Sequence, residues 1–351
     1  MSYKQMTGNI ISATKVEPAG ILINSAASGV WSLQEQYDYV KGGNWPNRAN
    51  LPRGLFFGGN TGSDSNVIDY ITIATTGNAT DFGDIIDAAY FLSGTGSSTR
   101  GVMTGGDSDS RANKLSYVTI ASTGDAADFG NLSGTRWITS TVGSNTRAVF
   151  MGGYDGEPTS NTIGYVTIAS LGNETDFGDL TQQVWKCAGS SSPTRGLRIA
   201  GNTASGANST GEDNTAVDVV DYITIASAGN ATDFGDTSSA RHQLSSASSN
   251  TRALTFGGAN TSGTVQNIVE YFTIDTTGNA TDFGDLSTAS ELGASVSNNI
   301  RACHALGYTS GIVNTIDYFT IASTGNATDF GNLSVTRYNM GGLSNGHGGL
   351  A

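Results

Sequence analysis

The segment at residues 67–85, VIDYITIATTGNATDFGDI, returns five more times with small changes, and this repetition constrains the fold more than any other feature. The anchor tyrosines are 47, 48, 57, 49 and 47 residues apart, at Tyr70, Tyr117, Tyr165, Tyr222, Tyr271 and Tyr318. A unit of this length cannot bury its own apolar faces, so it must pack against its neighbours. The period is typical of a four-stranded propeller blade and is too long for one turn of a parallel β-helix.

Each unit contains four candidate strands. The first is an apolar run that follows an arginine and ends in small residues; these arginines are Arg53, Arg100, Arg147, Arg195, Arg252 and Arg301. The second carries the anchor tyrosine, and the third carries a phenylalanine. A Gly-Asn pair between them predicts a hairpin with a type I′ or II′ turn. A looser fourth strand leads to the next arginine, so the sequence predicts an all-β, six-bladed propeller.

The two ends of the repeat region predict how the ring closes. The residues just before Arg53 are too short and irregular for a strand, whereas a full strand-like segment, residues 338–346, follows the sixth copy. We expect this C-terminal segment to lie beside the strand at residues 54–59, because closure removes the exposed edges of an open sheet. The predicted domains are an N-terminal docking arm, residues 1–52, and a propeller, residues 53–351.

The arm does not repeat, and its sequence SGVWSLQEQYDYVKGGNWP at residues 28–46 predicts one short helix. Ser32 and Glu35 form a capping box, and Gly42 can end the helix. The residues expected to dock are Trp31, Leu33, Tyr37, Val40 and Trp45. Such aromatic density favours an interface, since aromatic side chains dominate interface energetics. The alternative, that the arm packs on its own propeller, stays open.

Charge and cysteine content narrow the range of partners. The net charge is −13, which disfavours nucleic acid and anionic membranes as partners. Cys187 and Cys303 fall in different kinds of strand in different units, so we expect free buried thiols rather than a disulfide. The N-terminus shows no apolar signal segment, which leads us to expect synthesis in the cytoplasm.

Residues that repeat in all six units are interpreted as structural, because a ring needs a catalytic residue only once. The six arginines and six aspartates, the latter at Asp81, Asp128, Asp176, Asp233, Asp282 and Asp329, fit strand-end ion pairs or carboxylates that cap hairpin amides. Calcium binding by TDFGD is the alternative, although the oxygen ligands do not alternate as in a calcium loop. The NAT triplets are interpreted as turns rather than glycosylation sites.

No catalytic residue, metal site or cofactor is predicted. The three histidines, His242, His304 and His347, belong to different units and strands, so their spacing gives no metal triad. We therefore expect a protein that is not an enzyme.

Loops between the first and second strands vary freely, the longest beginning at Asn202, whereas the TGNAT hairpins are uniform. Since antiparallel strands alternate direction, the variable loops share one rim of the ring. Variable loops on a rigid scaffold are where binding usually occurs. The candidate contact residues are Asp107, Asp109, Tyr154, Asp155, Glu212, Asp213 and Tyr308.

The unit resembles a kelch repeat: an apolar strand that ends in a glycine pair, then a tyrosine strand, then an aromatic strand. Together, IDYITIATTGNATDFGDI and the arm segment look like repeat-bearing virion proteins of tailed phages that infect marine bacteria, cyanobacteria especially. The resemblance covers nearly the whole chain. It implies a virion structural protein, tail-fibre-like, with a kelch-like propeller, assembled into particles in the host cytoplasm.

These observations lead to one hypothesis and two alternatives. The hypothesis is a non-enzymatic, adhesin-like subunit whose arm binds other virion proteins and whose variable rim contacts a host glycan or another virion protein. A homotrimer is one arrangement that such a subunit could take on the particle. The alternatives are a capsid or neck decoration protein without receptor contact and a free carbohydrate-binding propeller.

Overall fold

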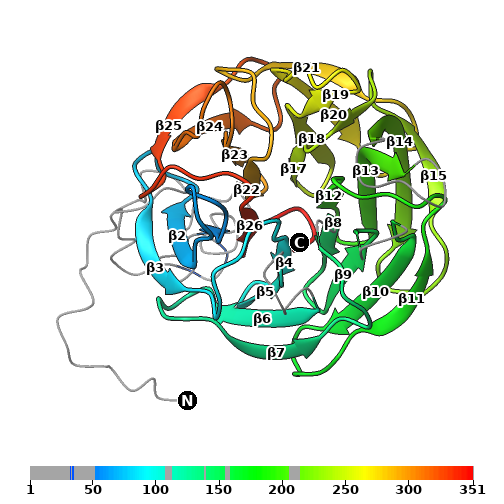
Figure 1. The fold of residues 1–351 in the computed structure, drawn as a ribbon, viewed down its shortest axis with the longest axis horizontal. Coiled ribbons are helices and arrows are strands. Elements are labelled where there is room, and N and C mark those ends of the chain that lie inside the picture. Colours follow the sequence, from blue (N-terminus) through cyan, green and yellow to red (C-terminus); the bar gives the residue numbers. More distant parts are fainter. Residues whose placement is uncertain are drawn as a thin grey trace. The chain divides into compact units, whose positions relative to one another are not determined.

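A computed structural model describes residues 32, 34, 52–106, 113–137, 140–154, 159–204 and 214–350. Six four-stranded antiparallel sheets lie in a ring around a central axis (Figure 1). Within the described part of residues 52–350 every regular element is a strand. The predicted all-β, six-bladed propeller is therefore confirmed.

Each blade runs from an inner strand beside the axis to an outer strand at the rim of the ring. In that order, the strands of blade 1 are β26 (Gly341–Ser344), β1 (Arg53–Phe57), β2 (Val67–Thr72) and β3 (Thr80–Asp84). Those of blade 2 are β4 (Gly94–Gly96), β5 (Arg100–Thr104), β6 (Lys114–Thr119) and β7 (Ala127–Asn131). Those of blade 3 are β8 (Ser140–Gly143), β9 (Arg147–Met151), β10 (Thr162–Thr167) and β11 (Thr175–Asp179).

The other three blades follow the same plan. Blade 4 has β12 (Ala188–Ser191), β13 (Arg195–Ala204), β14 (Asn214–Thr224) and β15 (Thr232–Asp236). Blade 5 has β17 (Ser245–Ser248), β18 (Arg252–Phe256), β20 (Ile268–Thr273) and β21 (Thr281–Asp285), with a small added sheet of β16 (Arg241–His242) and β19 (Ala259–Asn260). Blade 6 has β22 (Ala294–Ser297), β23 (Arg301–Ala305), β24 (Thr315–Thr320) and β25 (Thr328–Asn332).

The last strand of each sequence repeat is the inner strand of the next blade. Blade 1 receives its inner strand from the end of the chain, because β26 pairs with β1 from Gly54 opposite Ser344 to Phe57 opposite Gly341. The backbone N–H of Arg53 also donates to Asn345 Oδ1 at 2.7 Å. The predicted closure by the C-terminal segment is thus confirmed.

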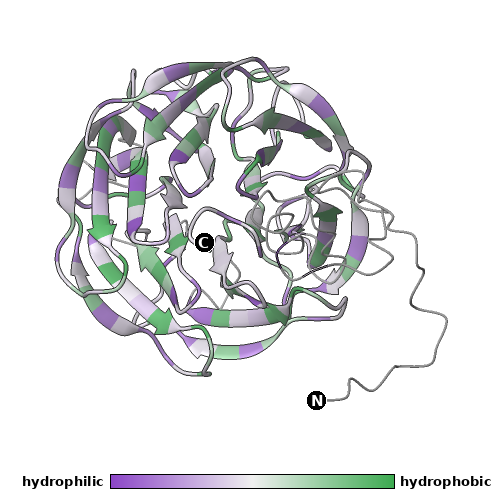
Figure 2. Cartoon of the chain, turned by 180° about the vertical axis from the view of Figure 1, so that it is seen from behind, coloured by the Kyte–Doolittle hydropathy of each residue, from purple (hydrophilic) through white to green (hydrophobic). Residues whose placement is uncertain are grey.

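The core is divided among the six blade interfaces. Between blades 6 and 1, for example, Phe56 and Ile71 pack with Val296 and Cys303, all of them buried. Each of the other five interfaces holds a similar cluster. Apolar positions accordingly recur among polar ones along the strands of every blade (Figure 2). Burial of apolar side chains at these interfaces is the main favourable contribution to the free energy of folding, and it is worth about 2 kcal/mol for each large side chain.

Two loop predictions were wrong. The connection between β2 and β3 was predicted to be a two-residue hairpin turn, but it spans residues 73–79. It is longer because it reaches the outer strand of blade 6, where it forms hydrogen bonds. The long segment after Asn202 was interpreted as a loop, but its ends extend β13 and β14, with Asn202 opposite Ala216. Of the predicted arm helix only Ser32 and Gln34 are described, and all five predicted docking residues lie outside the described residues.

Candidate binding rim and axial cavity

The six repeated arginines form a ladder of contacts that joins neighbouring blades. Each guanidinium lies over the anchor tyrosine of its own blade, with centroid distances from 4.2 Å at Arg301 to 4.6 Å at Arg53. Each also donates to an isoleucine carbonyl in the next blade, as Arg53 Nη1 does to Ile120 O at 3.0 Å. Contacts of this kind combine cation–π attraction with a charge-assisted hydrogen bond. The other five arginines repeat the geometry around the closed ring.

The uniform TGNAT segments clip each blade onto the preceding one. Gly77 N donates to Phe330 O and Ala79 N to Asn332 O, each at 2.8 Å, and Asn78 Oδ1 accepts from Asn332 N at 3.1 Å. The same amides and side-chain oxygen recur at every interface, with Asp125 in place of the asparagine in blade 2. This repeated contact explains why the segment is uniform, and it gives the asparagine of each NAT triplet a structural role.

The prediction that the six aspartates pair with the six arginines was wrong. The arginines bind tyrosine rings and carbonyls instead, while Asp81 and its equivalents lie exposed on the outer strands. Amide capping is performed by other acids, since Asp69 Oδ2 accepts from Ser334 N at 3.2 Å and Asp317 Oδ2 from Ser287 N at 2.9 Å. These acids directly precede the anchor tyrosines, a position that the sequence interpretation did not single out.

The variable rim is the face that carries two sets of connections: those between the second and third strands of a blade, and those leading from an outer strand to the next inner strand. Of the predicted contact residues, Tyr154 and Tyr308 are described and both lie on this rim. The remaining five, Asp107, Asp109, Asp155, Glu212 and Asp213, lie outside the described residues.

Both tyrosines meet aromatic residues that the sequence interpretation missed. The Tyr154 ring lies 5.1 Å from that of Trp137 and 5.0 Å from that of Trp185. Tyr308, 36% exposed, lies 6.0 Å from Tyr338. The missed residues lie in the connections that lead from an outer strand to the next inner strand. The sequence interpretation considered only the variable loops between the first and second strands of each repeat.

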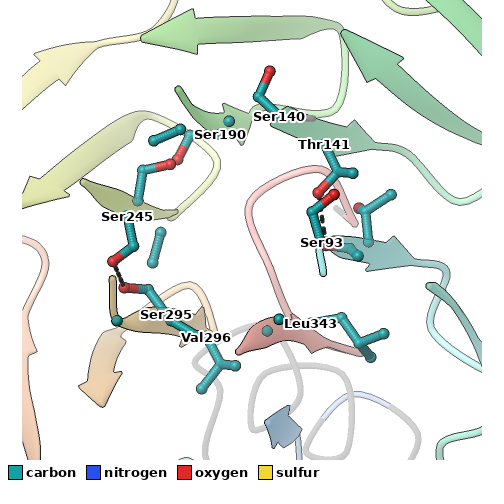
Figure 3. Close-up of a pocket in the computed structure, with 18 of the residues that line it drawn as sticks. Ser93, Ser140, Thr141, Ser190, Ser245, Ser295, Val296 and Leu343 are labelled. Carbon is teal, nitrogen blue, oxygen red and sulfur yellow. Dashed lines mark hydrogen bonds between the residues drawn. The ribbon is translucent and has the colours of Figure 1, made fainter. Parts of the chain in front are cut away.

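An axial cavity of about 160 Å³ opens at this rim between the inner strands (Figure 3). Hydroxyl side chains line much of it, including Ser245, whose oxygen lies 2.6 Å from that of Ser295. Small residues dominate because neighbouring inner strands approach closely: a Cβ at Gly342 would lie 2.7 Å from Ser295 O. The cavity can therefore offer hydrogen bonds to a small polar group.

Five residues with left-handed backbone surround the opening and are called the mouth ring: Phe91, Lys186, Gln243, Leu292 and Asn339, with φ between 54° and 59°. Four of their amides donate to the preceding member, as Phe91 N does to Asn339 O at 2.8 Å. Left-handed backbone is uncommon for such residues and persists only where the surroundings enforce it. The mouth thus has a rigid backbone but side chains that differ from blade to blade.

Charged groups beside the mouth are partly desolvated. Burial lowers the pKa of Lys186, while Glu291 acts in the opposite direction, and Lys186 Nζ lies 4.1 Å from the Trp185 ring centroid. Burial raises the pKa of Glu291. The pKa of His242 falls to about 4, mainly through burial and secondarily through Lys186. Burial therefore disfavours the charged forms of these groups, while the attraction between Lys186 and Glu291 partly offsets this effect.

The C-terminal tail forms the floor of the cavity. Serines of four inner strands donate in turn to carbonyls of the preceding blade, as Ser344 Oγ does to Ser297 O at 2.7 Å; the others are Ser191, Ser248 and Ser297. Blades 2 and 3 have Gly96 and Gly143 at this position. His347 Nε2 lies 2.7 Å from Gly96 O, and Gly349 N donates to His347 Nδ1 at 3.1 Å. In blades 3 to 6 the carbonyl at this position accepts from a serine of the following blade, but the blade that follows blade 2 has Gly143 there. His347 of the tail supplies the hydrogen-bond partner of Gly96 O in its place.

The remaining sequence candidates are structural. Both cysteines are free and buried, as predicted, and burial raises the pKa of Cys303. His304 stacks on Phe256 at 5.2 Å and lies within hydrogen-bonding distance of three serines. Among the described residues no group of three or more His, Cys, Asp or Glu is placed to hold a metal ion. No helix in that part of the chain is long and apolar enough to span a membrane.

Comparison of the sequence with protein families and with curated proteins finds no match.

Proposed function

We propose that this chain is a non-enzymatic, adhesin-like structural component of a phage virion that binds its target with the variable rim and the axial mouth. The main support for a binding role is a contrast between the residues that repeat and those that differ from blade to blade. The polar residues that repeat, including the arginine ladder and the Asn clips, form contacts between blades. The side chains that differ between blades gather on one face around a rigid opening. A scaffold of this kind supplies rigidity, and its loops supply specificity.

The proposed virion location rests on the resemblance of the repeats and arm to phage virion proteins, and the kelch-like type rests on the resemblance of the unit to kelch repeats. The proposed docking role of the arm rests on its aromatic residues. The target of the rim is proposed to be a host surface glycan, since half-buried aromatic rings beside hydroxyl groups suit sugar rings with polar edges. Trp185 and Tyr154 are the aromatic side chains best placed for this contact.

The test combines location with binding. We expect an antibody against the propeller to label purified particles of the phage that encodes it, and the purified protein to bind a glycan on an array. Trp185→Ala should weaken that binding at least tenfold, whereas Leu171→Ser, an exposed position on the opposite rim, should leave it unchanged. Unlabelled particles would contradict the virion location. Labelled particles without any glycan binding would favour a decoration protein.

A further inference from the structure

Each blade has a buried slot beneath the connection that leads into its inner strand. In blades 1, 3 and 5 an arginine from that connection fills the slot and pairs with a buried carboxylate. The pairs are Arg337 with Asp69, Arg136 with Glu174, and Arg241 with Glu270. In blade 3 the usual acid position is Gly164, and the carboxylate of Glu174 occupies the space that a side chain at residue 164 would need.

The same two carbonyls hold the guanidinium in blades 1 and 3, and in blade 5 the first of them, Gly257 O, accepts from Arg241 Nη1 at 2.8 Å. Arg337 Nη1 donates to Gly58 O at 3.2 Å and to Val67 O at 2.7 Å. Arg136 Nη1 donates to the equivalent pair in blade 3, Gly152 O at 3.3 Å and Thr162 O at 3.0 Å. The carbonyls belong to the residue after the second strand of the blade and to the first residue of the third strand. The backbone of this fold is thus a recurrent receptor for guanidinium.

Blade 4 fills the slot from the second strand of the blade instead. Arg198 on β13 donates to Ala200 O at 3.0 Å and to Val219 O at 2.9 Å, and it pairs with Asp221. In blade 6 the residue that corresponds to Arg198 in sequence is His304, and its ring nitrogens lie within hydrogen-bonding distance of serine hydroxyls, including that of Ser290 at 3.2 Å. Four of the six slots therefore hold an arginine of the chain itself.

Blade 2 alone has none of these groups among the described residues. Ala89 stands where Arg136 and Arg337 stand in their blades, Met103 corresponds to Arg198, and Ser116 replaces the buried acid. A cavity of about 140 Å³ remains, and its lining includes Ala89, Ser116 and the two residues whose carbonyls are equivalent to the guanidinium acceptors, Gly105 and Lys114. Among the described residues, this cavity has the backbone of an arginine slot without an arginine.

We propose that the blade 2 slot binds the guanidinium group of an arginine side chain presented by a partner protein. Besides the two carbonyls, Asp128 lines the cavity, and its negative charge favours a cation. Ile86, 49% exposed, lies at the same cavity and offers apolar surface to the methylene stem of an arginine. Lys114 also lines the cavity and opposes a cation, so Lys114→Met should strengthen binding. The inference does not depend on where the protein acts.

Calorimetric titration of the full chain with a blocked Gly-Arg-Gly peptide tests the proposal. We expect saturable binding, at least tenfold weaker binding of the lysine peptide, and no detectable binding of the isosteric, uncharged citrulline peptide. Ser116→Asp supplies the missing acid and should tighten binding about tenfold. Ala89→Arg should abolish binding while the thermal midpoint stays the same or rises, which separates a filled slot from a misfolded chain.

Several results would overturn the proposal. The wild-type chain could fail to bind the arginine peptide, or Ala89→Arg could bind it as well as wild type does. Arg111 lies in the sequence between Gly106 and Lys114, two residues that line the cavity, so binding that emerges only in Arg111→Ala would assign the slot to this arginine of the chain itself. Methylguanidinium that binds as tightly as the peptide would point to a small-molecule ligand in place of a protein partner.

Discussion

At the scale of single residues, the glycine of each TDFG or ADFG segment is required for two reasons, its backbone conformation and its lack of a side chain. Gly178 has φ of +148°, and a Cβ there would lie 2.6 Å from the carbonyl group of Gly229 in the next blade. The clip of that blade therefore needs both the backbone conformation and the missing side chain. This contact explains why a glycine follows the phenylalanine in every repeat.

Gly178→Ala should lower the free energy of unfolding by about 3 kcal/mol, because it combines backbone strain with overlap against a neighbouring backbone. Gly172→Ala is the matched control, since a Cβ at residue 172 would have no atom within 4 Å and the φ of this glycine is not left-handed. The control should change stability by less than about 0.5 kcal/mol. Denaturant titration of both variants measures the difference, and equal stabilities would refute the clip geometry.

At the scale of elements, β26 and the tail have separable roles. β26 supplies the inner strand of blade 1, and its Leu343 is buried with Leu55 and Phe57. The tail beyond it contributes the His347 contact with Gly96. Closure therefore depends on the strand, whereas the floor of the cavity depends on the tail.

Two truncations distinguish these roles. Ending the chain after Met340 should expose the edge of β1 and cause aggregation or a large loss of stability. Ending it after Gly346 should retain a folded monomer with a modest loss, about 1 to 2 kcal/mol, from the missing hydrogen bonds. Light scattering and thermal unfolding report both outcomes. If the two truncated chains behaved alike, β26 would not be the closing element.

The periodic features could be predicted from the sequence, and the exceptions could not. The recurrence of the anchor tyrosine predicts the number of blades, and the surplus segment at residues 338–346 indicates how the ring closes. The mouth ring was missed because its members, such as Phe91 and Lys186, share a backbone conformation but no residue type. The role of Glu174 was missed because its carboxylate occupies the place of the acid that blade 3 lacks at Gly164. The two positions do not coincide when the repeats are aligned, so the sequence alone does not show this replacement.

At the scale of the whole molecule, three histidines are buried or half-buried, and burial lowers the pKa of His304 to about 3 and of His242 and His347 to about 4. The unfolded chain therefore binds more protons than the folded chain between the ordinary histidine pKa, about 6.5, and these lowered values. Stability should fall as pH decreases through this window, by at most about 1.4 kcal/mol per pH unit for each histidine. Asp317, whose pKa burial raises, acts in the opposite direction.

The variant His304→Gln measures the contribution of this histidine to the loss of stability at low pH. The variant should show a shallower loss of stability than the wild-type chain between about pH 6.5 and 4, because it removes a proton that only the unfolded state binds. Unfolding free energies measured across this range give the two slopes. Identical slopes would show that His304 is not held neutral in the fold.

Amide hydrogen exchange at the six clip segments tests most directly the claim that repeated residues join the blades into a closed ring. These segments are exposed and lie outside the strands, so by themselves their amides would exchange as open loops do. The account predicts strong protection at Gly77, Gly124, Gly172, Gly229, Gly278 and Gly325, each of which donates to the outer strand of the neighbouring blade. Exchange at unprotected rates in these six glycines would contradict it.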